Sequence, residues 1–197
     1  MKFLLATTNE GKIREYRHLL GKAGLEFVTL EDVGITEKPE ETGATCEENA
    51  ILKAKFYFDK SNGMPTLADD AGLEIDALGG EPGTRTRRWP GYEASDEELV
   101  RYTLERMKGI PLEKRTAKFT AVLAVMSKDG GVRTFTGVLE GRIEEKPFYP
   151  IVPGYPFRSL FYEFQTGKVL AELPIEELPN GHRQQAMKKA LPYLRSL

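Results

Sequence analysis

Two adjacent carboxylates, Asp69 and Asp70, follow a short apolar run and come just before Gly72. The pattern predicts a strand that ends at a glycine turn, and loops beyond strand ends often carry catalytic side chains. Two neighbouring acids repel each other unless a cation or a shared proton relieves the repulsion, so a divalent metal is the simplest explanation of the pair. Aspartate is also a common turn former. The pair alone leaves a metal site and an Asx-type turn open.

A polar segment from Thr7 to Lys12 stands between a predicted strand and a predicted helix. Backbone N–H groups and the helix dipole favour an anion at such a place, and Lys12 adds a full positive charge. The segment resembles a phosphate cradle, but it is not a Walker motif. That motif requires a glycine where Ala6 stands and a serine or threonine where Ile13 stands. An N-capping loop with a solvated lysine is the alternative interpretation.

An acidic connection carries Glu40 and Glu41 towards a predicted helix that contains Lys53. Either glutamate, together with Asp69 and Asp70, would make an oxygen-rich site suited to Mg²⁺. A solvated acidic loop and a surface lysine are the more common explanations of such residues. The sequence alone does not decide between these interpretations.

Two further groups of side chains are candidates for contacts with a ligand. His182 and Arg183 follow a Pro-Asn-Gly sequence and open the last predicted helix, which places them near a loop. Tyr155, Phe157 and Phe161 offer flat aromatic faces that suit stacking on a base, and core packing is the alternative.

The predicted elements alternate between strands and helices. Thr45 with Glu48, and Ser95 with Glu98, have the spacing of capping boxes that begin helices. A turn at residues 129–131 predicts a hairpin of two strands. Hydrophobic periodicity predicts strands at residues 2–6, 25–30, 64–68, 73–78, 118–126, 132–143 and 160–164, and helices at 13–20, 45–59, 95–108 and 184–194.

The composition limits the class of protein. The chain has 197 residues, of which 40% are hydrophobic and 29% charged, values typical of a globular domain. The formal net charge of −2 supplies no global attraction to nucleic acid, and a small anionic ligand is favoured instead. No stretch approaches the roughly 20 apolar residues of a membrane span, and the first residues lack the pattern of a signal peptide. The single cysteine, Cys46, excludes an internal disulfide and favours a cytoplasmic location.

Seven short blocks follow one another along nearly the whole chain. They are residues 6–12, 40–43 with 48–54, 68–73, 78–83, 137–143, 171–173 and 182–183. In this order they resemble the inosine triphosphate pyrophosphatase family, which hydrolyses deaminated purine nucleoside triphosphates to a monophosphate and pyrophosphate. The resemblance implies an α/β fold with a long mixed β-sheet flanked by helices, forming one domain over residues 1–197. That domain is expected to have two lobes and a central cleft, and to form a homodimer.

The resemblance also assigns roles to individual residues. Asp70 matches the general base, which activates the water that attacks the α-phosphorus. The cofactor is expected to be Mg²⁺, held by Glu40, Asp69 and Asp70. The phosphates of the substrate are expected to contact Thr7, Thr8, Asn9, Glu10, Gly11, Lys12, Lys53 and Arg87. The base is expected to contact Ala71, Tyr155, Phe157, Arg158, His182 and Arg183.

The departures from the family pattern lie in the region expected to bind the base. Arg158 stands where the family has an aspartate, so an acceptor is replaced by a donor, and Leu178 stands near the place of a lysine. We therefore expect that phosphate chemistry is retained while base selectivity is shifted or relaxed. A catalytically weak nucleotide-binding regulatory protein and a pyrophosphatase for other modified nucleotides are the alternatives.

Overall fold

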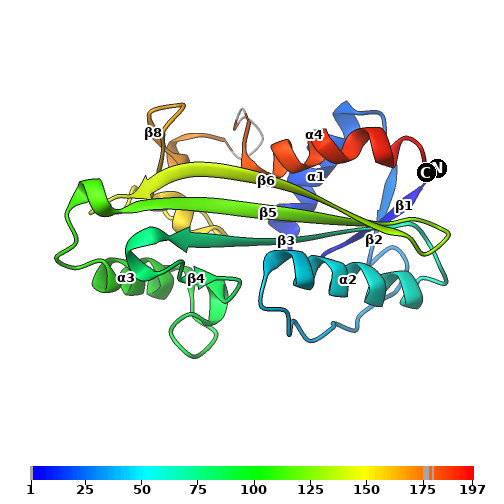
Figure 1. Cartoon of the computed structure of the whole chain (residues 1–197), viewed down its shortest axis with the longest axis horizontal. Helices are drawn as coiled ribbons and strands as arrows, with labels where there is room; N and C mark the ends of the chain where they lie inside the picture. The colour runs from blue at the N-terminus through cyan, green and yellow to red at the C-terminus, as the bar shows by residue number, and fades with distance from the viewer. Residues whose placement is uncertain (1, 175–177, 179) are drawn as a thin grey trace. The chain divides into compact units, whose positions relative to one another are not determined.

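The computed structural model describes residues 2–174, 178 and 180–197 (Figure 1). The chain folds into two compact units. The first contains residues 1–71, 121–137 and 181–197, and the second contains residues 72–120 and 138–180. Five successive segments of the chain therefore belong in turn to the first, second, first, second and first unit.

The strands form one mixed sheet, as the sequence predicts. Its order is β2-β1-β3-β5-β6-β7-β8, and β4 pairs with β3. Strand β1 runs parallel to β2 and β3, whereas β3 with β4, β6 with β7 and β7 with β8 are antiparallel. The strands are β1 (Phe3–Ala6), β2 (Phe27–Thr29), β3 (Thr66–Ile75), β4 (Pro82–Gly83), β5 (Thr116–Met126), β6 (Val132–Ile143), β7 (Phe161–Glu163) and β8 (Lys168–Val169).

Two helices begin at the caps that the sequence predicts, whereas the first and last helices begin three and two residues earlier than predicted. Thr45 accepts a hydrogen bond from the backbone of Glu48, and Ser95 forms a complete capping box with Glu98. The helices are α1 (Glu10–Lys22), α2 (Cys46–Lys60), α3 (Asp96–Arg106) and α4 (His182–Leu194). Short 3-10 turns include η2 (Thr86–Arg88), η4 (Pro156–Ser159) and η5 (Leu170–Glu172).

In the first unit, helices cover both faces of the sheet (Figure 1). Leu67 of β3 belongs to a core cluster with residues of α1 and α4, such as Leu20 and Met187. The next residue, Ala68, belongs to a different cluster with Ala50 and other residues of α2. Successive strand residues point to opposite faces, so the odd-numbered β3 residues face α1 and α4 and the even-numbered ones face α2.

The second unit has a core of its own. Leu73 and Ile75 of β3 pack with Leu99 of α3 and with Phe161 of β7. Phe157 of η4 is buried in the same cluster. The short η4 turn is therefore anchored by its aromatic residue.

The predicted break between two strands at residues 69–72 is wrong. Strand β3 runs without interruption from Thr66 to Ile75 and includes Asp69, Asp70 and Gly72. Its first half pairs with β1 through Ala68, and its second half pairs with β4 through Leu73. Pairing with neighbouring strands outweighs the local turn preference of aspartate and glycine, because strand propensity depends strongly on context.

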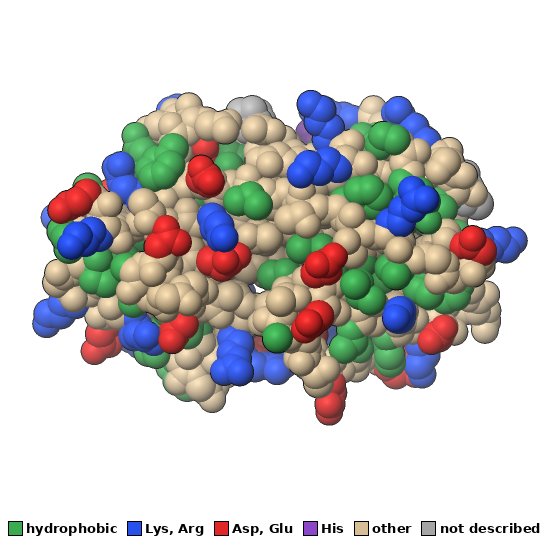
Figure 2. Space-filling model, in the orientation of Figure 1, with side chains coloured by type: hydrophobic (Ala, Val, Ile, Leu, Met, Phe, Trp, Pro, Cys, Tyr) green, Lys and Arg blue, Asp and Glu red, His purple; other side chains and the backbone are tan. Residues whose placement is uncertain are grey.

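The charged side chains are mixed in sign. Figure 2 shows Lys and Arg side chains interspersed with Asp and Glu on the visible face, in keeping with the net charge of −2. Within the described residues, no helix combines the length and the apolar character needed to cross a membrane.

Candidate active site

Asp69 and Asp70 point to opposite faces of the sheet. Strand geometry directs Asp69, like Leu67, towards α1 and α4, and directs Asp70, like Ala68, towards α2. The contacts agree, because Asp69 pairs with Lys12 and Arg183 while Asp70 pairs with Lys53. Each carboxylate has its own cation, so the repulsion expected between the two acids is relieved within the protein.

Asp70 is held by one short ion pair. Nζ of Lys53 donates to Oδ1 of Asp70 over 2.6 Å, and the Asp70 side chain is only 10% exposed. Its other oxygen, Oδ2, is buried and has no hydrogen-bond partner among the described residues. Burial raises the pKa of Asp70 above its ordinary value, although Lys53 and Lys12 act in the opposite direction. The site therefore holds a carboxylate with one unused oxygen and an increased affinity for a proton.

Glu41, rather than Glu40, approaches this pair. Oε1 of Glu41 lies 3.3 Å from Nζ of Lys53, and the Glu41 side chain is 46% exposed. Burial lowers the pKa of Lys53, but Asp70 and Glu41 outweigh this effect and leave the pKa raised. Glu40 is exposed to solvent.

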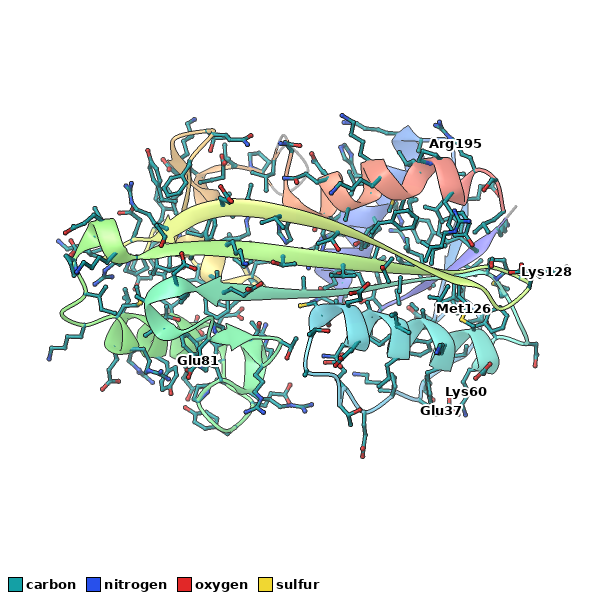
Figure 3. All side chains as sticks on the ribbon, in the orientation of Figure 1. Glu37, Lys60, Glu81, Met126, Lys128 and Arg195 are labelled. Atoms are coloured by element: carbon teal, nitrogen blue, oxygen red, sulfur yellow. The ribbon has the colours of Figure 1, made fainter. Side chains whose placement is uncertain are left out.

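The acidic connection is fixed against α2 at two places. Oδ1 of Asn49 accepts a hydrogen bond from the backbone N of Gly43 over 2.8 Å, and a side chain at position 43 would lie 2.6 Å from that oxygen. Earlier in the connection, Glu37 accepts a hydrogen bond from Nζ of Lys60 over 2.7 Å, and Figure 3 shows the two side chains together. Glu41 is thus carried by a loop that is tied to the helix on both sides of it.

Asp69 joins two helices. Its Oδ2 accepts a hydrogen bond from Nε of Arg183 over 2.8 Å and lies 3.4 Å from Nζ of Lys12. The Asp69 side chain is completely buried, and Nη1 of Arg183 lies 3.5 Å from Glu15. Burial raises the pKa of Asp69, but Arg183 and Lys12 outweigh it and hold that pKa far below its ordinary value. Burial, followed by the charge of Asp69, raises the pKa of Tyr16 well above its usual range.

The segment from Thr7 to Lys12 caps α1 and presents Lys12 at the end of β1. Oδ1 of Asn9 accepts from the backbone N of Lys12 over 3.1 Å, and Thr7 accepts from the backbone N of Asn9. Thr8 and Glu10 are exposed, whereas Gly11 is buried. Nζ of Lys12 also donates to the backbone oxygen of Asp69, so this lysine is not a solvated one. Burial lowers its pKa, although Asp69 opposes that change.

His182 and Arg183 begin α4 and are both buried. Their side chains contact each other, with 3.2 Å between Nε2 of His182 and Nη1 of Arg183. Gly137 of β6 permits the close approach of α4, because a side chain there would meet the backbone oxygen of His182. In the first unit the structure thus brings Lys12, Asp69 and Arg183 together, with Ala71 two residues further along β3.

Arg87 belongs to the second unit and is part of an ion pair there. Its Nη1 lies 2.7 Å from Asp96, and the Arg87 side chain is 42% exposed. The other oxygen of Asp96 accepts from the backbone N of Gly154 over 2.7 Å. Asp96 therefore connects Arg87 to the loop that precedes Tyr155.

Arg158 is buried in the second unit and binds backbone. Its Nη2 donates to the carbonyl oxygens of Leu170 and Leu173, both over 2.6 Å. Phe157 is buried and packs against Trp89, with ring centroids 6.4 Å apart. Leu178 is also buried in the core of this unit, while residues 175–177 and 179 lie outside the described part of the chain.

Comparison with known proteins gives a full-length match. The model of the Ham1 family matches residues 3–193. The chain belongs to the Ham1 family. It is 43% identical over 201 residues to the dITP/XTP pyrophosphatase of Symbiobacterium thermophilum, covering 100% of this chain and 96% of that protein. The dITP/XTP pyrophosphatase of Bacillus subtilis is 38% identical, with 94% of this chain and 93% of that protein covered.

Solved structures of the Ham1 family have the same fold. A HAM1 protein from Coxiella burnetii superposes with a TM-score of 0.85 at 32% identity, and both chains are completely covered. The Ham1 protein of Staphylococcus aureus superposes with a TM-score of 0.84 at 28% identity, covering 100% of this chain and 99% of that one. The resemblance predicted from the seven sequence blocks and the predicted mixed α/β fold are both confirmed.

The carboxylates of this Ham1-family chain are not grouped as a preformed metal cage. Within the described residues, no three His, Cys, Asp or Glu side chains gather closely enough to hold a metal ion. The structure does not bring Glu40 together with Asp69 and Asp70, and the two aspartates themselves face opposite ways, as adjacent strand residues do. Mg²⁺ commonly binds through only one or two carboxylates plus substrate phosphates and water, so this arrangement suits it.

Two residues of this Ham1-family site were missed by sequence reasoning. Glu15 and Tyr16 lie on α1, three and four residues after Lys12, and helix geometry places such residues on the same face. That spacing was a usable signal. Glu41 was recognised only as an alternative to Glu40, and nothing in the sequence distinguishes which of two adjacent loop carboxylates reaches Lys53.

Proposed function

We propose that this Ham1-family chain hydrolyses nucleoside triphosphates with deaminated purine bases to a nucleoside monophosphate and pyrophosphate. Two relatives that match it over nearly their full length are dITP/XTP pyrophosphatases. The observation that carries the proposal is the pairing of Asp70 with Lys53, since it supplies a buried carboxylate next to a cation. Lys12 on the other face of β3 adds a second cation at the end of β1.

Phosphate binding is assigned to the two lysines and to the start of α1. Lys12 and the backbone of the preceding segment lie at a helix N-terminus, which favours an anion. Lys53 and Lys12 are both largely buried, so their charges act with little screening by water. Thr8 and Asn9 are exposed in this segment and complete the proposed phosphate contacts.

The charge of the site favours a divalent cation with the substrate. The ion-paired side chains of the candidate site are Lys12, Lys53, Arg183, Glu15, Glu41, Asp69 and Asp70. Three positive and four negative charges leave the group with a net charge of −1 before a polyanionic triphosphate arrives. Oδ2 of Asp70 and the exposed carboxylate of Glu41 are the groups that would hold Mg²⁺. When bound, the ion would offset the charge of the phosphates and of the leaving pyrophosphate.

Asp70 is assigned as the general base. Its raised pKa increases its ability to take a proton, and Oδ2 is available to a water molecule or a metal ligand shell. Lys53 holds Oδ1 and so fixes the orientation of the carboxylate. The proton of the attacking water would pass to Asp70 as the water oxygen bonds to the α-phosphorus, while the bond from the α-phosphorus to the bridging oxygen breaks and pyrophosphate leaves.

Base selectivity is proposed to be relaxed relative to that implied by the family pattern. Nη2 of Arg158 is engaged by two backbone carbonyls, and Phe157 and Leu178 are buried in the core. The polar groups that the resemblance leads one to expect at position 158 and near position 178 are thus replaced by structural ones. Tyr155, His182 and Arg183 stay as proposed base contacts.

A substrate panel tests the proposed function. Pyrophosphate release would be followed with Mg²⁺ and with inosine, xanthosine, guanosine, adenosine and cytidine triphosphates, in ribose and deoxyribose forms. We expect turnover of the inosine and xanthosine nucleotides. The preference for them over the guanosine nucleotides should be smaller than that of a pocket that recognises the base by hydrogen bonds. Strong and exclusive preference for the deaminated purines would contradict relaxed selectivity, and release of orthophosphate would contradict the reaction itself.

Two further properties follow from the same resemblance. A homodimer and a cytoplasmic location are expected for this chain. Light scattering of the purified protein across a dilution series measures the first. The expected result is twice the mass of a single chain, even at low concentration. Fractionation of cells that express the chain measures the second.

A further inference from the structure

The position of Asp69 in β3 separates it from the other acids of the site. Asp69 and Asp70 are consecutive residues of a regular strand, so their side chains leave the sheet on opposite faces. Asp70 and Glu41 are both linked to Lys53 of α2, whereas Asp69 contacts α1 and α4. A single ion held by Asp70 and Glu41 would therefore lie on the α2 side of the strand.

The surroundings of Asp69 are unsuited to a hydrated cation. Its side chain is completely buried, while those of Asp70 and Glu41 are 10% and 46% exposed. Mg²⁺ releases water reluctantly and usually keeps several water ligands, so it favours a site with access to water, which the exposed carboxylate of Glu41 provides on the Asp70 side of β3. Two cations, Lys12 and Arg183, already lie within 3.4 Å of Oδ2 of Asp69 and would repel a third.

The same contacts make Asp69 the centre of a clamp. Oδ2 of Asp69 lies 2.8 Å from Nε of Arg183 and 3.4 Å from Nζ of Lys12. Nη1 of Arg183 in turn lies 3.5 Å from Oε2 of Glu15. The positive and negative charges alternate along this chain of four side chains. Lys12 and Glu15 come from one helix face, so the clamp fixes the start of α1 relative to α4 and β3.

We propose that Asp69 is a positioning residue, which holds Lys12 and Arg183 in place for the nucleotide and does not bind the metal. The proposal rests on the proposed function in taking Lys12 and Arg183 as nucleotide contacts and Asp70 with Glu41 as the metal ligands. It reassigns one of the carboxylates that the sequence places in the metal site.

The test separates metal binding from nucleotide binding in matched variants. Asp69→Asn and Asp70→Asn would be compared with the parent protein and with Asp59→Asn, which changes an exposed aspartate at the end of α2. Binding of Mn²⁺ without nucleotide would be measured by electron paramagnetic resonance. KM and kcat for inosine triphosphate would be measured at saturating Mg²⁺.

Asp69→Asn is expected to bind Mn²⁺ within about threefold of the parent, while Asp70→Asn binds it at least ~10-fold more weakly. Asp69→Asn is expected to raise KM at least ~10-fold, with a smaller fall in kcat, because a displaced Lys12 weakens ground-state binding. An equal loss of Mn²⁺ affinity in both variants would overturn the proposal. So would an unchanged KM in Asp69→Asn.

Two additions keep the test decisive. If Asp69→Asn does not fold, Arg183→Lys takes its place, because it removes the Nε donor and keeps the charge. This variant should raise KM and leave Mn²⁺ binding unchanged. An unchanged KM overturns the clamp. If the parent turns over no triphosphate, the proposed reaction fails separately. The dissociation constant of inosine triphosphate, measured by calorimetry, then replaces KM, and it should rise in Asp69→Asn if the clamp exists.

Discussion

Nζ of Lys53 donates to Oδ1 of Asp70 over 2.6 Å and leaves Oδ2 without a partner among the described residues. The pair connects α2 to β3, and both side chains are about nine-tenths buried. A lysine that holds one oxygen of a carboxylate fixes the direction of the other oxygen. This relationship gives Asp70 the orientation that a general base requires.

Asp70→Asn is expected to lower kcat at least ~10²-fold, because asparagine cannot accept the proton of the attacking water. KM should change less, since Lys53 and Lys12 both remain. Steady-state pyrophosphate release measures both constants. Asp59→Asn is the control, because it makes the same change at an exposed position outside the site. Activity close to that of the parent would remove Asp70 from the role of base.

Glu41→Gln and Glu40→Gln form a matched pair that tests which loop carboxylate serves the site. Both glutamates are exposed, but only Glu41 is ion-paired with Lys53 among the described residues, at 3.3 Å. Glu41→Gln is expected to raise the Mg²⁺ concentration for half-maximal activity about tenfold, and Glu40→Gln should leave it unchanged. A titration of activity with Mg²⁺ measures this, and the reverse order of effects would restore Glu40 to the site.

Local rules predicted the features that depend on neighbouring residues. The caps at Thr45 and Ser95 depend on side chains three residues apart, and both are found. The residues that flank the turn at 129–131 form neighbouring strands, as expected. Lys53 and Asn49 share a face of α2 and are both buried.

Contacts between distant segments could not be predicted in the same way. The turn expected at Asp69 and Asp70 is replaced by a continuous strand because β1 and β4 pair with its two halves. That single error concealed the opposite orientation of the two carboxylates. Arg158 gave no local signal of its partners, which are carbonyls 12 and 15 residues further along the chain.

The contribution of Asp69 to stability should depend on pH with a definite sign. Its pKa in the folded protein lies below its ordinary value of 3.8, so folding favours the charged form. The stability that it contributes is fully present above pH 3.8 and is lost as the pH falls below that value towards the folded pKa. Asp69→Asn should therefore be less stable than the parent at pH 7 by about 3 kcal/mol, the usual cost of breaking a buried ion pair.

Urea unfolding with a chelator, at pH 7 and at steps from pH 5 to pH 3, measures this difference without a bound metal. The difference in the free energy of unfolding between the parent and Asp69→Asn should decrease only at the acid end of the series. A gap that is constant over the whole range would show that the charge of Asp69 does not contribute.

Arg158→Met should destabilise the second unit by about 2 kcal/mol, because it leaves two buried carbonyl oxygens without their donor. Arg158→Lys keeps the charge and one donor group and should cost less. Since Nη2 binds backbone, both variants should change kcat/KM for inosine and guanosine triphosphates by similar factors. Thermal unfolding and the two activity ratios provide the measurements, and a large change in the ratio without loss of stability would make Arg158 a direct base contact.

Gly137→Ala should displace the start of α4 and, with it, Arg183. An added side chain at position 137 would meet the backbone oxygen of His182 and would lie 2.7 Å from the backbone N of Ala186. These atoms belong to the backbone of α4 and cannot move as a single side chain would, so a loss of about 2–3 kcal/mol is expected. KM should rise as well, since Arg183 and Asp69 would separate. The value of kcat should stay near that of the parent, because Asp70 and Lys53 lie on the other face of β3.

Gly21→Ala is the matched control, because position 21 lies in α1 with nothing within 4 Å of an added side chain. It should stabilise the protein by about 0.5–1 kcal/mol through helix propensity and leave KM unchanged. Urea unfolding and steady-state kinetics on the two variants measure both effects. If Gly137→Ala kept the parent KM, α4 would tolerate movement without consequence for the nucleotide, and the role assigned to the contact between Arg183 and Asp69 would be wrong.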